Sequence, residues 1–360
     1  MTGTAVVVGA GVGGLATAIG LRRAGWTVSI LERRTELERY GTAFGIHPTA
    51  QAALDRLGVG EAFRDRAVPY RGARIRTPQG KALASLPLER IERKAGRPEL
   101  LVARPYLIDA LLGELDAFGD VPLKFGENVR DVAALVAGHD LVVGADGIRS
   151  AVRASRFGDR SGPRRIGTVA WIGIADFESG VYGETWGKGR FFGMTPVEPG
   201  RTNWYATVPE ATTAEELRGH FEGWHDPVPR ILAETAPSTW TRYEMRHLFP
   251  ALPTFVHDGR DGRDGHGGHG GKVALVGDAA HAMTPNLGQG ACTAILDAEA
   301  LTRAVSEHAP ASGLPSALRA YDSERRRSAQ RVAFASRNLH RFMATEHTRM
   351  RDLLVRMMPT

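Results

Sequence analysis

The chain has 360 residues, of which 42% are hydrophobic, enough to bury a sizeable core in one large or two intertwined domains. Its single cysteine, Cys292, excludes an intrachain disulfide framework and predicts a reducing, cytoplasmic environment. The uncharged stretch over residues 2–21 has no basic start and contains closely spaced glycines, which argues against a signal peptide or a membrane span.

The net charge of +6 is localised. From Pro315 onward there are ten arginines and four acidic residues, so this segment carries the whole excess. We therefore expect no nucleic-acid site and no membrane insertion, but the solvated face of a basic amphipathic helix. Its apolar side is predicted from residues that recur at helical intervals: Val332, Leu339, Met343, Met350 and Leu354.

The first predicted elements are a strand over residues 4–8, a helix over 13–24 and a strand over 27–32. The turn after the first strand has the spacing GxGxxG. Gly9 permits a tight turn, Gly11 lets the backbone approach a pyrophosphate, and Gly14 lets helix and strand pack closely. With Val12 and Gly13, the turn directs unpaired N–H groups and the positive end of the helix at phosphates.

Glu32 ends the second strand, where a carboxylate binds both hydroxyls of an adenosine ribose. It would repel a 2′-phosphate, so NADP is disfavoured at this position. A glycine-rich turn without a ligand explains neither Glu32 nor the spacing. The motif thus predicts a dinucleotide site, but it does not distinguish NAD from FAD.

Further helices are predicted over residues 49–57 and 104–115, and residues 141–143 form an apolar strand typical of a parallel sheet. From residue 165 to about 208, short aromatic strands alternate with glycine turns, as in an antiparallel sheet. A helix near 213–223 follows. The chain then returns to an apolar strand at Val273 and a helix over 291–306.

The strand at Val273 ends in Asp278, at the edge of an α/β sheet where ligands gather. A carboxylate there accepts hydrogen bonds from a polyol, which FAD has in its ribityl chain and NAD lacks. Behind Pro285, Gly288 and Gly290 let the backbone approach a planar ring, and the next helix directs its positive end at a reduced flavin. The alternative, that Asp278 only caps a helix, leaves these glycines unexplained.

These elements predict an α/β fold: a discontinuous Rossmann-like FAD-binding domain with a parallel sheet, an inserted mixed, largely antiparallel β-sheet domain for substrate, and C-terminal helices. We expect the FAD-binding domain over residues 1–70, 99–164 and 256–310. The inserted domain is expected over 71–98 and 165–255, and the helical segment over 311–360.

The segment 257–271 is rich in Gly, Asp, Arg and His. Its three histidines, His257, His266 and His269, raise the alternative of a metal site, but nothing fixes ligand geometry, and a solvated loop is expected. A phosphate-binding P-loop before Lys272 is excluded, because its first glycine and its Ser or Thr are missing. We expect no metal.

The chain resembles the FAD-dependent aromatic hydroxylases, the single-component flavoprotein monooxygenases, along nearly its whole length. Three motifs occur in the family's order: GxGxxG with Glu32-Arg33, Asp146-Gly147, and Gly277-Asp278 followed by Pro285. The resemblance is strongest to the branch of salicylate-, urate- and zeaxanthin-type enzymes. It implies non-covalent FAD contacts at further residues: Arg33, Arg104, Val129, Asp146, Pro285, Gln289 and Ala291.

The resemblance implies a monooxygenase. NADH or NADPH binds transiently and reduces FAD, O2 adds to form a flavin C4a-hydroperoxide, and one oxygen passes to a small, aromatic or otherwise electron-rich substrate. The polar residues Asn286 and His47 are candidates to position the substrate and to act as a base. Candidate pocket walls, equally expected as ordinary core, are Trp171, Phe192, Met194 and Trp204.

Two alternatives stay open: an FAD-dependent reductase of the same fold that does not use O2, and a non-catalytic flavin-binding protein. A flavin halogenase is disfavoured, because the segment Trp-x-Trp-x-Ile-Pro is missing. Cys292 lies beside small residues at a helix start and is expected to be a buried packing residue, not a redox thiol. The sequence leaves the substrate open and is compatible with a monomer or a homodimer.

Overall fold

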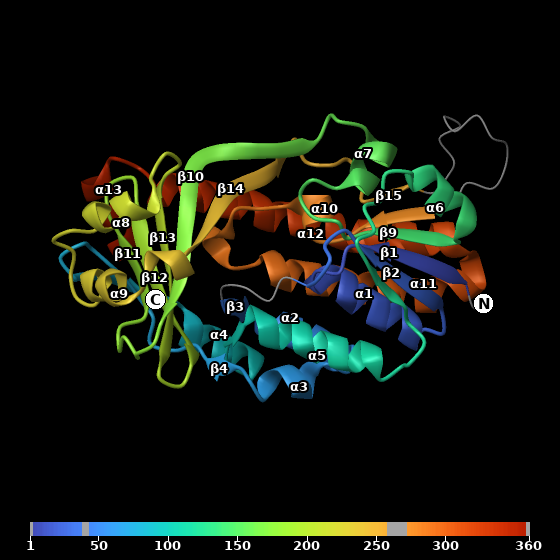
Figure 1. Cartoon of the computed structure of the whole chain (residues 1–360), viewed down its shortest axis with the longest axis horizontal. Helices are drawn as coiled ribbons and strands as arrows, with labels where there is room; N and C mark the ends of the chain where they lie inside the picture. The colour runs from blue at the N-terminus through green and yellow to red at the C-terminus, as the bar shows by residue number, and fades with distance from the viewer. Residues whose placement is uncertain (1–2, 38–42, 258–271, 358–360) are drawn as a thin grey trace.

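The computed structural model describes residues 3–37, 43–257 and 272–357 (Figure 1). His266 and His269 of the predicted glycine-rich loop lie outside the described residues, so the expectation for that loop stays a prediction. The described chain forms two halves that are connected by long strands (Figure 1). One half is built on a six-stranded sheet and the other on a seven-stranded sheet.

The first half is built on a six-stranded sheet in the order β15-β16-β9-β1-β2-β8. All neighbours pair in parallel except β15 and β16. The centre of the sheet is apolar and covered on both faces, so that Leu141, Val142 and Val143 are fully buried. The strands are β1 (Thr4–Val8), β2 (Thr27–Glu32), β8 (Leu123–Phe125), β9 (Leu141–Gly144), β15 (Val256–His257) and β16 (Lys272–Leu275).

Three helices predicted from the sequence pack together beside this sheet. They are α1 (Val12–Arg23), α5 (Arg104–Asp116) and α11 (Gly290–Ser312), which extends further than expected. The remaining short helices are α2 (Pro48–Arg56), α3 (Gly60–Arg64), α4 (Leu88–Ala95), α6 (Val132–Gly138), α7 (Ala151–Phe157), α10 (Asp278–His281), η1 (Pro237–Thr239) and η2 (Pro285–Leu287). A small sheet of β3 (Ala43–Ile46), β7 (Leu100–Ala103) and β4 (Val68–Pro69) lies toward the second half.

The second half contains a seven-stranded sheet, here called the large sheet, in the order β14-β10-β13-β12-β11-β5-β6. Its neighbours are antiparallel except β11 and β5, so the predicted mixed sheet is confirmed. β10 and β14 reach from this half toward the first (Figure 1). The strands are β5 (Arg74–Arg76), β6 (Ala82–Ser85), β10 (Gly162–Ala175), β11 (Gly183–Trp186), β12 (Phe191–Glu198), β13 (Arg201–Pro209) and β14 (Thr241–Phe249).

The two faces of the large sheet have different neighbours. One face packs against α8 (Ala214–His220) and α9 (Val228–Glu234) in an aromatic core, where Phe192 and Trp204 stack with ring centroids 5.6 Å apart. All four predicted substrate-pocket walls, Trp171, Phe192, Met194 and Trp204, belong to this core. Of the two roles expected for these side chains, the structure shows the second: they belong to the core beneath the two helices.

The C-terminal segment forms two helices, α12 (Leu314–Met343) and α13 (Thr348–Arg356). Met343 is fully buried, as predicted, but Met350 is 62% exposed and Leu354 45% exposed. The prediction of one continuous apolar side was wrong because the helix is interrupted after Met343 and the second helix turns Val355 and Arg351 inward. Arg351 is held there by the backbone carbonyls of Trp186, Gly187 and Met343.

The predicted division into domains stays a proposal that these sheets support. The strands of the large sheet come from residues 74–85 and 162–249, which agrees with an insertion into the first half. β10 begins at Gly162, inside the segment assigned to the FAD-binding domain.

Candidate functional site

The first glycine turn is fixed by close backbone contacts. Gly9 has a φ of +106°, and a Cβ there would lie 2.4 Å from the Ala145 carbonyl oxygen. A Cβ on Gly14 would lie 1.9 Å from the Gly9 carbonyl oxygen. Gly11 differs, because no described protein atom lies within 4 Å of its Cβ position. Gly9 and Gly14 are thus required by the fold, whereas the space beside Gly11 is open for a ligand.

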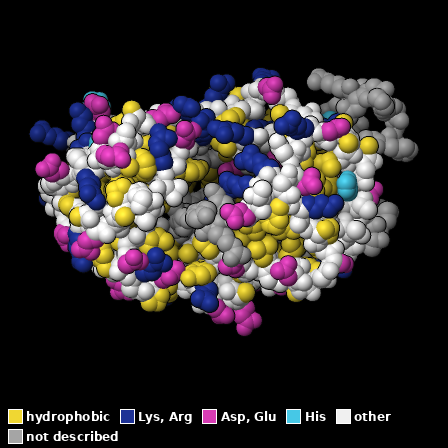
Figure 2. All heavy atoms as spheres, viewed as in Figure 1, with side chains coloured by type: hydrophobic (Ala, Val, Ile, Leu, Met, Phe, Trp, Pro, Cys, Tyr) yellow, Lys and Arg dark blue, Asp and Glu magenta, His cyan; other side chains and the backbone are white. Residues whose placement is uncertain are grey.

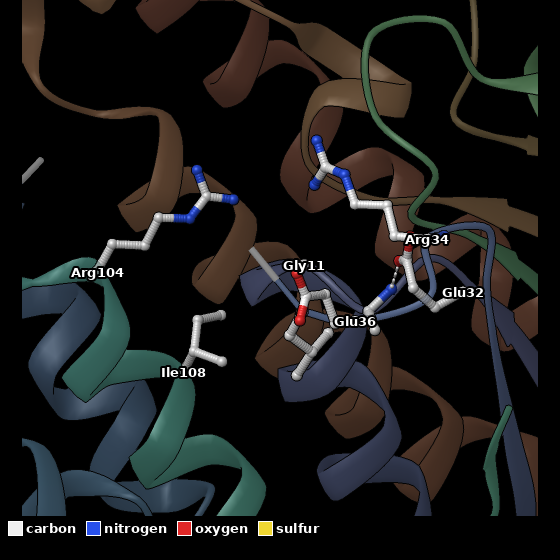
Figure 3. A pocket seen from close by; sticks show the side chains of 8 residues that line it. Gly11, Glu32, Arg34, Glu36, Arg104 and Ile108 are labelled. Carbon is white, nitrogen blue, oxygen red and sulfur yellow. Dashed lines mark hydrogen bonds between the residues drawn. The ribbon is translucent and has the colours of Figure 1, made fainter. Parts of the chain in front are cut away.

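A pocket opens beside this turn (Figure 3). Arg104 and Ile108 enter it from α5, and Glu32, Arg34 and Glu36 enter it from β2 and the segment behind it. The pocket is completed by Ala10, Gly11 and Leu37. Arg34 lines the pocket, and the predicted contact of the adjacent Arg33 stays a prediction.

The Glu32 carboxylate is held by the backbone. It accepts hydrogen bonds from the Ala10 N–H at 2.8 Å and the Arg34 N–H at 3.0 Å. The Glu127 N–H donates to the Glu32 carbonyl at 2.9 Å, which brings the segment of Val129 to the same end of the site. A carboxylate fixed at the tip of β2 can bind the hydroxyls of a ribose.

The second motif closes the middle of the site. Asp146 Oδ2 accepts hydrogen bonds from the N–H groups of Ala151 at 2.7 Å and Val152 at 3.2 Å. Asp146 Oδ1 is buried and has no hydrogen-bond partner among the described residues. A buried acceptor of this kind suits a donor supplied by a ligand or water.

Arg153 connects the second motif to the third. Its guanidinium is buried and donates to the carbonyls of Ile148 at 2.7 Å and Ala279 at 3.0 Å. The two segments lie more than 120 residues apart in the sequence, so this side chain fixes their relative position. The sequence showed Arg153 only as part of the second motif.

Asp278 begins α10 at the end of β16 and keeps an exposed side chain. Burial by surrounding protein raises the pKa of its carboxyl group, and the nearby charges of His281 and Arg104 partly offset that rise. The Asp278 side chain is thus accessible to solvent and at the same time surrounded by protein, as is typical of a carboxyl group at the base of a cleft. Figure 2 shows a hollow between the two halves, bordered by Lys and Arg side chains.

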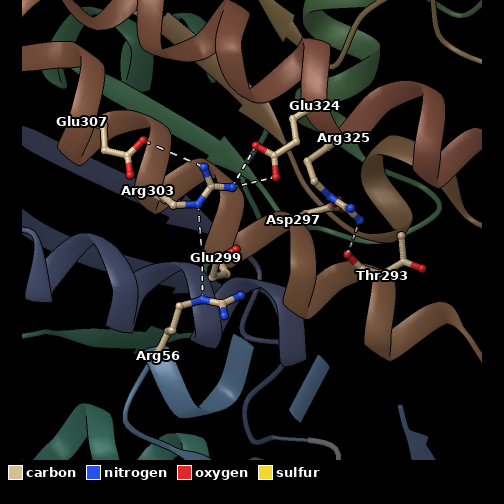
Figure 4. Close-up of polar contacts among 8 residues, drawn as sticks. All are labelled: Arg56, Thr293, Asp297, Glu299, Arg303, Glu307, Glu324 and Arg325. Atoms are coloured by element: carbon tan, nitrogen blue, oxygen red, sulfur yellow. Dashed lines mark hydrogen bonds and ion pairs between the residues drawn. The ribbon is translucent and has the colours of Figure 1, made fainter. Parts of the chain in front are cut away.

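A buried network beneath Asp278 was not predicted from the sequence (Figure 4). Asp297 in α11 is fully buried and accepts hydrogen bonds from the Gly277 N–H at 3.0 Å, from His281 Nε2 at 2.5 Å and from Arg325 Nε at 2.9 Å. Burial alone would raise the pKa of Asp297, but His281, Arg325 and the Gly277 N–H hold it below its usual value. The only sequence signal was two acids, Asp297 and Glu299, in the otherwise apolar run Ala294–Leu301.

The third motif ends in an open cradle. Gly288 has a φ of +62°, and neither it nor Gly290 has a described protein atom within 4 Å of its Cβ position. Gln289 precedes α11, and no described side chain caps that helix start. Between Pro285 and this cradle, Asn286 donates from Nδ2 to Met343 Sδ at 3.5 Å, and its buried Oδ1 has no partner among the described residues.

His47 lies at the start of α2, against the same cradle. Its backbone N–H contacts Cys292 Sγ at 3.4 Å, and Cys292 donates to the Gly45 carbonyl at 3.0 Å. His47 Nε2 lies 3.5 Å from Glu99 Oε2. Burial raises the pKa of the Cys292 thiol to about 12 and the residue is fully buried, so the expectation of a packing cysteine is confirmed.

These features fit FAD. Gly11 and Gly288 leave room where a bulkier residue would fill it, Glu32 and Asp278 are carboxylates at two separate strand ends, and the start of α11 has no described side-chain cap. An NAD-sized ligand would leave the third motif without a function. The fold and the site together define a flavoprotein that binds an extended dinucleotide across its first sheet.

Comparison with known proteins agrees with this conclusion. A family model described as an FAD binding domain matches residues 2–336, and the chain belongs to this family. It is 35% identical to the aurachin C monooxygenase/isomerase of Stigmatella aurantiaca, over 89% of this chain and 85% of that protein. It is 33% identical to the 2-heptyl-3-hydroxy-4(1H)-quinolone synthase of Pseudomonas aeruginosa, over 83% and 80%.

Among solved structures, HpxO of Klebsiella pneumoniae, complexed with FAD and uric acid, has the same fold. The TM-score is 0.82 at 24% identity, over 98% of this chain and 91% of that chain. The protein is an FAD-dependent monooxygenase of the aromatic hydroxylase group, with NAD(P)H as electron donor, as its sequence predicted. In the described part of the chain, no group of three or more His, Cys, Asp or Glu could hold a metal ion. None of the described helices has the length and apolar character that crossing a membrane requires.

Proposed function

We propose that the substrate is a neutral, fused-ring nitrogen heteroaromatic compound with a ring N–H, and that one oxygen atom is inserted at an electron-rich ring carbon. The names of two relatives support this class. One is a 2-heptyl-3-hydroxy-4(1H)-quinolone synthase and another an FAD-dependent urate hydroxylase, and quinolones and urate are both fused nitrogen heterocycles.

The observation that carries the proposal is the character of the large sheet's inner face, defined as the alternate side chains Ile172, Glu184, Asn203 and Tyr205. The register of β10 to β13 places these residues opposite the face packed on α8 and α9. The Asn203 side chain accepts from the Ala43 N–H at 3.3 Å, so this face is turned toward β3 and the cradle.

The inner face is flat, aromatic and polar. The Tyr205 ring covers Gly193, where a Cβ would lie 2.0 Å from the ring, and its hydroxyl donates to Glu184 Oε1 at 2.8 Å. Trp186 donates to the other carboxyl oxygen of Glu184 at 2.7 Å. Burial raises the pKa of Glu184, which favours its uncharged form. Such a surface suits a flat, uncharged ring with its own donors and acceptors better than a carboxylate.

Bound FAD, once reduced by NAD(P)H, supplies the activation of O2, and the polypeptide positions the substrate and excludes water. We propose that Asn286 orients the substrate through its unpartnered Oδ1, and that His47, at the border of the cleft, accepts a substrate proton. We also propose a cytoplasmic monomer or homodimer in which the nicotinamide cofactor binds transiently. The single buried cysteine and the one GxGxxG that stands between a strand and a helix in the described residues support this.

The test is a substrate screen on the FAD-loaded protein. We expect 4(1H)-quinolones to accelerate NAD(P)H oxidation and to take up isotope from labelled O2, and salicylate to do neither. Acceleration by salicylate alone, or by a quinolone without isotope uptake, would contradict the proposal.

A second test concerns Asn286. We expect Asn286→Ala to retain FAD and to form less hydroxylated product per NAD(P)H consumed, because the substrate loses a positioning contact. An unchanged product yield with the quinolone would remove Asn286 from the site.

A further inference from the structure

Glu99 is a buried acid that neither FAD binding nor packing explains. It precedes β7 and is 9% exposed. Within the described residues, its only ion-pair partner is His47, whose Nε2 lies 3.5 Å from Glu99 Oε2. A buried carboxylate that has no permanently charged partner destabilises the folded protein, so a functional role would explain why an acid stands at this position.

The pair lies directly behind the flavin cradle. A Cβ on Gly45 would lie 2.6 Å from Glu99 Oε1, so the carboxyl group rests on β3. The Gly45 carbonyl accepts a hydrogen bond from Cys292, the third residue of α11, and α11 begins at Gly290 of the cradle. The His47 side chain is 22% exposed and the Glu99 side chain 11% exposed. The imidazole is therefore accessible to a ligand, and the carboxyl group stands behind it.

We propose that Glu99 and His47 form a proton-accepting pair, in which His47 takes the ring N–H or O–H proton of the substrate and Glu99 stabilises the resulting imidazolium. The substrate N–H or O–H bond breaks and its electron pair stays on the ring. An N–H bond forms on the imidazole nitrogen that does not face Glu99. The anionic ring is the more electron-rich acceptor for oxygen. This inference rests on the proposed substrate class.

Burial acts on both groups of the pair. It raises the pKa of Glu99 to about 7 and lowers the pKa of His47. His47 Nε2 and Glu99 Oε2 lie 3.5 Å apart, so an ionised Glu99 offsets the burial effect that disfavours a charged His47. Burial also raises the pKa of the other ionisable groups around Glu99, which disfavours their charged forms: Cys292 of α11, Tyr70 after β4, and Tyr205 and Glu184 of the inner face.

Two arginines lie near this cluster. Arg76 acts on Tyr70 and donates to the Tyr182 carbonyl at 2.8 Å. The Arg104 guanidinium lies 5.8 Å from the centre of the Phe44 ring, next to Gly45 in the sequence. Glu99 is the acid in contact with His47 and therefore the group that balances a charged imidazole.

The first experiment needs no substrate. The ring-proton NMR signal of His47, identified by its loss in His47→Gln, is titrated in the FAD-loaded protein and in Glu99→Gln. We expect the native signal to show an inflection near pH 7 from Glu99, and Glu99→Gln to lose it and titrate His47 at lower pH. A native signal without that inflection, or one that Glu99→Gln leaves unchanged, overturns the pair.

The second experiment measures the pH dependence of kcat/KM for the quinolone-stimulated reaction. The native enzyme should gain activity as pH rises through about 7. Glu99→Gln should lose this inflection, fall by about 100-fold at neutral pH, and recover at alkaline pH, where the substrate ionises unaided. The control is Glu92→Gln, the same change in α4 on a carboxylate that pairs with Arg71. It should keep the native profile.

The two outcomes separate the two proposals. If the NMR coupling is present but no heterocycle is turned over, the proton pair stands and the proposed substrate class fails. If the quinolone is hydroxylated and Glu99→Gln keeps the native pH profile with FAD retained, the substrate class stands and the pair is overturned. His47→Gln, at the partly exposed position, gives a second variant should Glu99→Gln fail to fold.

Discussion

Replacing Asp297 by asparagine tests the buried network beneath Asp278. Asp297→Asn preserves the shape of the side chain but removes the charge that balances Arg325, which is 8% exposed. Removing one partner of a buried ion pair costs about 3–5 kcal/mol. The amide oxygen of asparagine keeps an acceptor for the Gly277 N–H or for Arg325, so we expect the lower end, about 3 kcal/mol.

The assay combines thermal unfolding of the FAD-free protein with FAD titration. At about 2 °C per kcal/mol for a chain of this size, Tm should fall by roughly 6 °C. FAD should bind about tenfold more weakly, equivalent to about 1.4 kcal/mol, because one amide oxygen cannot serve both the Gly277 N–H, next to Asp278, and Arg325. Glu324→Gln is the control, since Glu324 is 45% exposed and its ion pair with Arg303 contributes at most about 1 kcal/mol (Figure 4). Equal Tm and equal FAD affinity in the two variants would refute the reasoning.

Three further predictions follow from the same structure. Gly11→Ala should leave the Tm of the FAD-free protein within about 2 °C of the native value and weaken FAD binding at least about tenfold. Gly14→Ala places its Cβ 1.9 Å from a carbonyl oxygen, so it should lower the Tm of the FAD-free protein itself, and equal losses of Tm in the two variants would contradict this contrast. Burial, followed by the charges of neighbouring Arg341 and His247, lowers the pKa of His340 to about 4. As pH falls, the unfolded chain takes up this proton before the folded protein does, so the free energy of unfolding should fall between about pH 6.5 and 4. Urea titrations of His340→Gln should show a shallower fall, and a pH slope identical to the native one would count against this reasoning. Arg351→Met should cost about 3 kcal/mol because three buried carbonyls lose their donor, and Arg349→Met, at an exposed position, about 0.5 kcal/mol or less; a urea midpoint that moves equally in both would show that the anchor is unimportant.

The parts of the site that were predictable are those encoded by local spacing. Gly9, Gly11 and Gly14 stand at fixed distances within one turn, and Asp278 follows an apolar strand directly, so short-range geometry is enough to identify them. The fold class was predictable for the same reason. Continuous apolar strands indicated a parallel sheet, and short aromatic strands separated by glycine turns indicated an antiparallel one.

The substrate side was not predictable, because it depends on which face of a strand meets which helix. Phe191 and Phe192 are adjacent and equally apolar, so no alternation shows which one faces the core. Packing of α8 and α9 makes that choice, and only the fold reveals it. Glu99 is a single acid in a short loop, and its meeting with His47 depends on β3 and β7 pairing.

The break between α12 and α13 has a similar origin. No glycine or proline marks residues 344–347. The second helix is positioned by Arg351, whose partners lie partly in β11 and the turn behind it, more than 160 residues away. Periodicity alone therefore predicted one apolar side for residues that tertiary contacts divide between two helices with different buried faces.

The pleat of the large sheet has a consequence for how this scaffold can change. Along β12 and β13, every second residue belongs to the aromatic core and the residues between them belong to the inner face. Neighbouring residues on these strands therefore pack against different parts of the molecule. A library that varies Thr195, Asn203 and Tyr205 while keeping Phe192, Met194 and Trp204 would explore new substrates on an unchanged aromatic core. The same alternation offers lineages a way to acquire new chemistry without first losing stability.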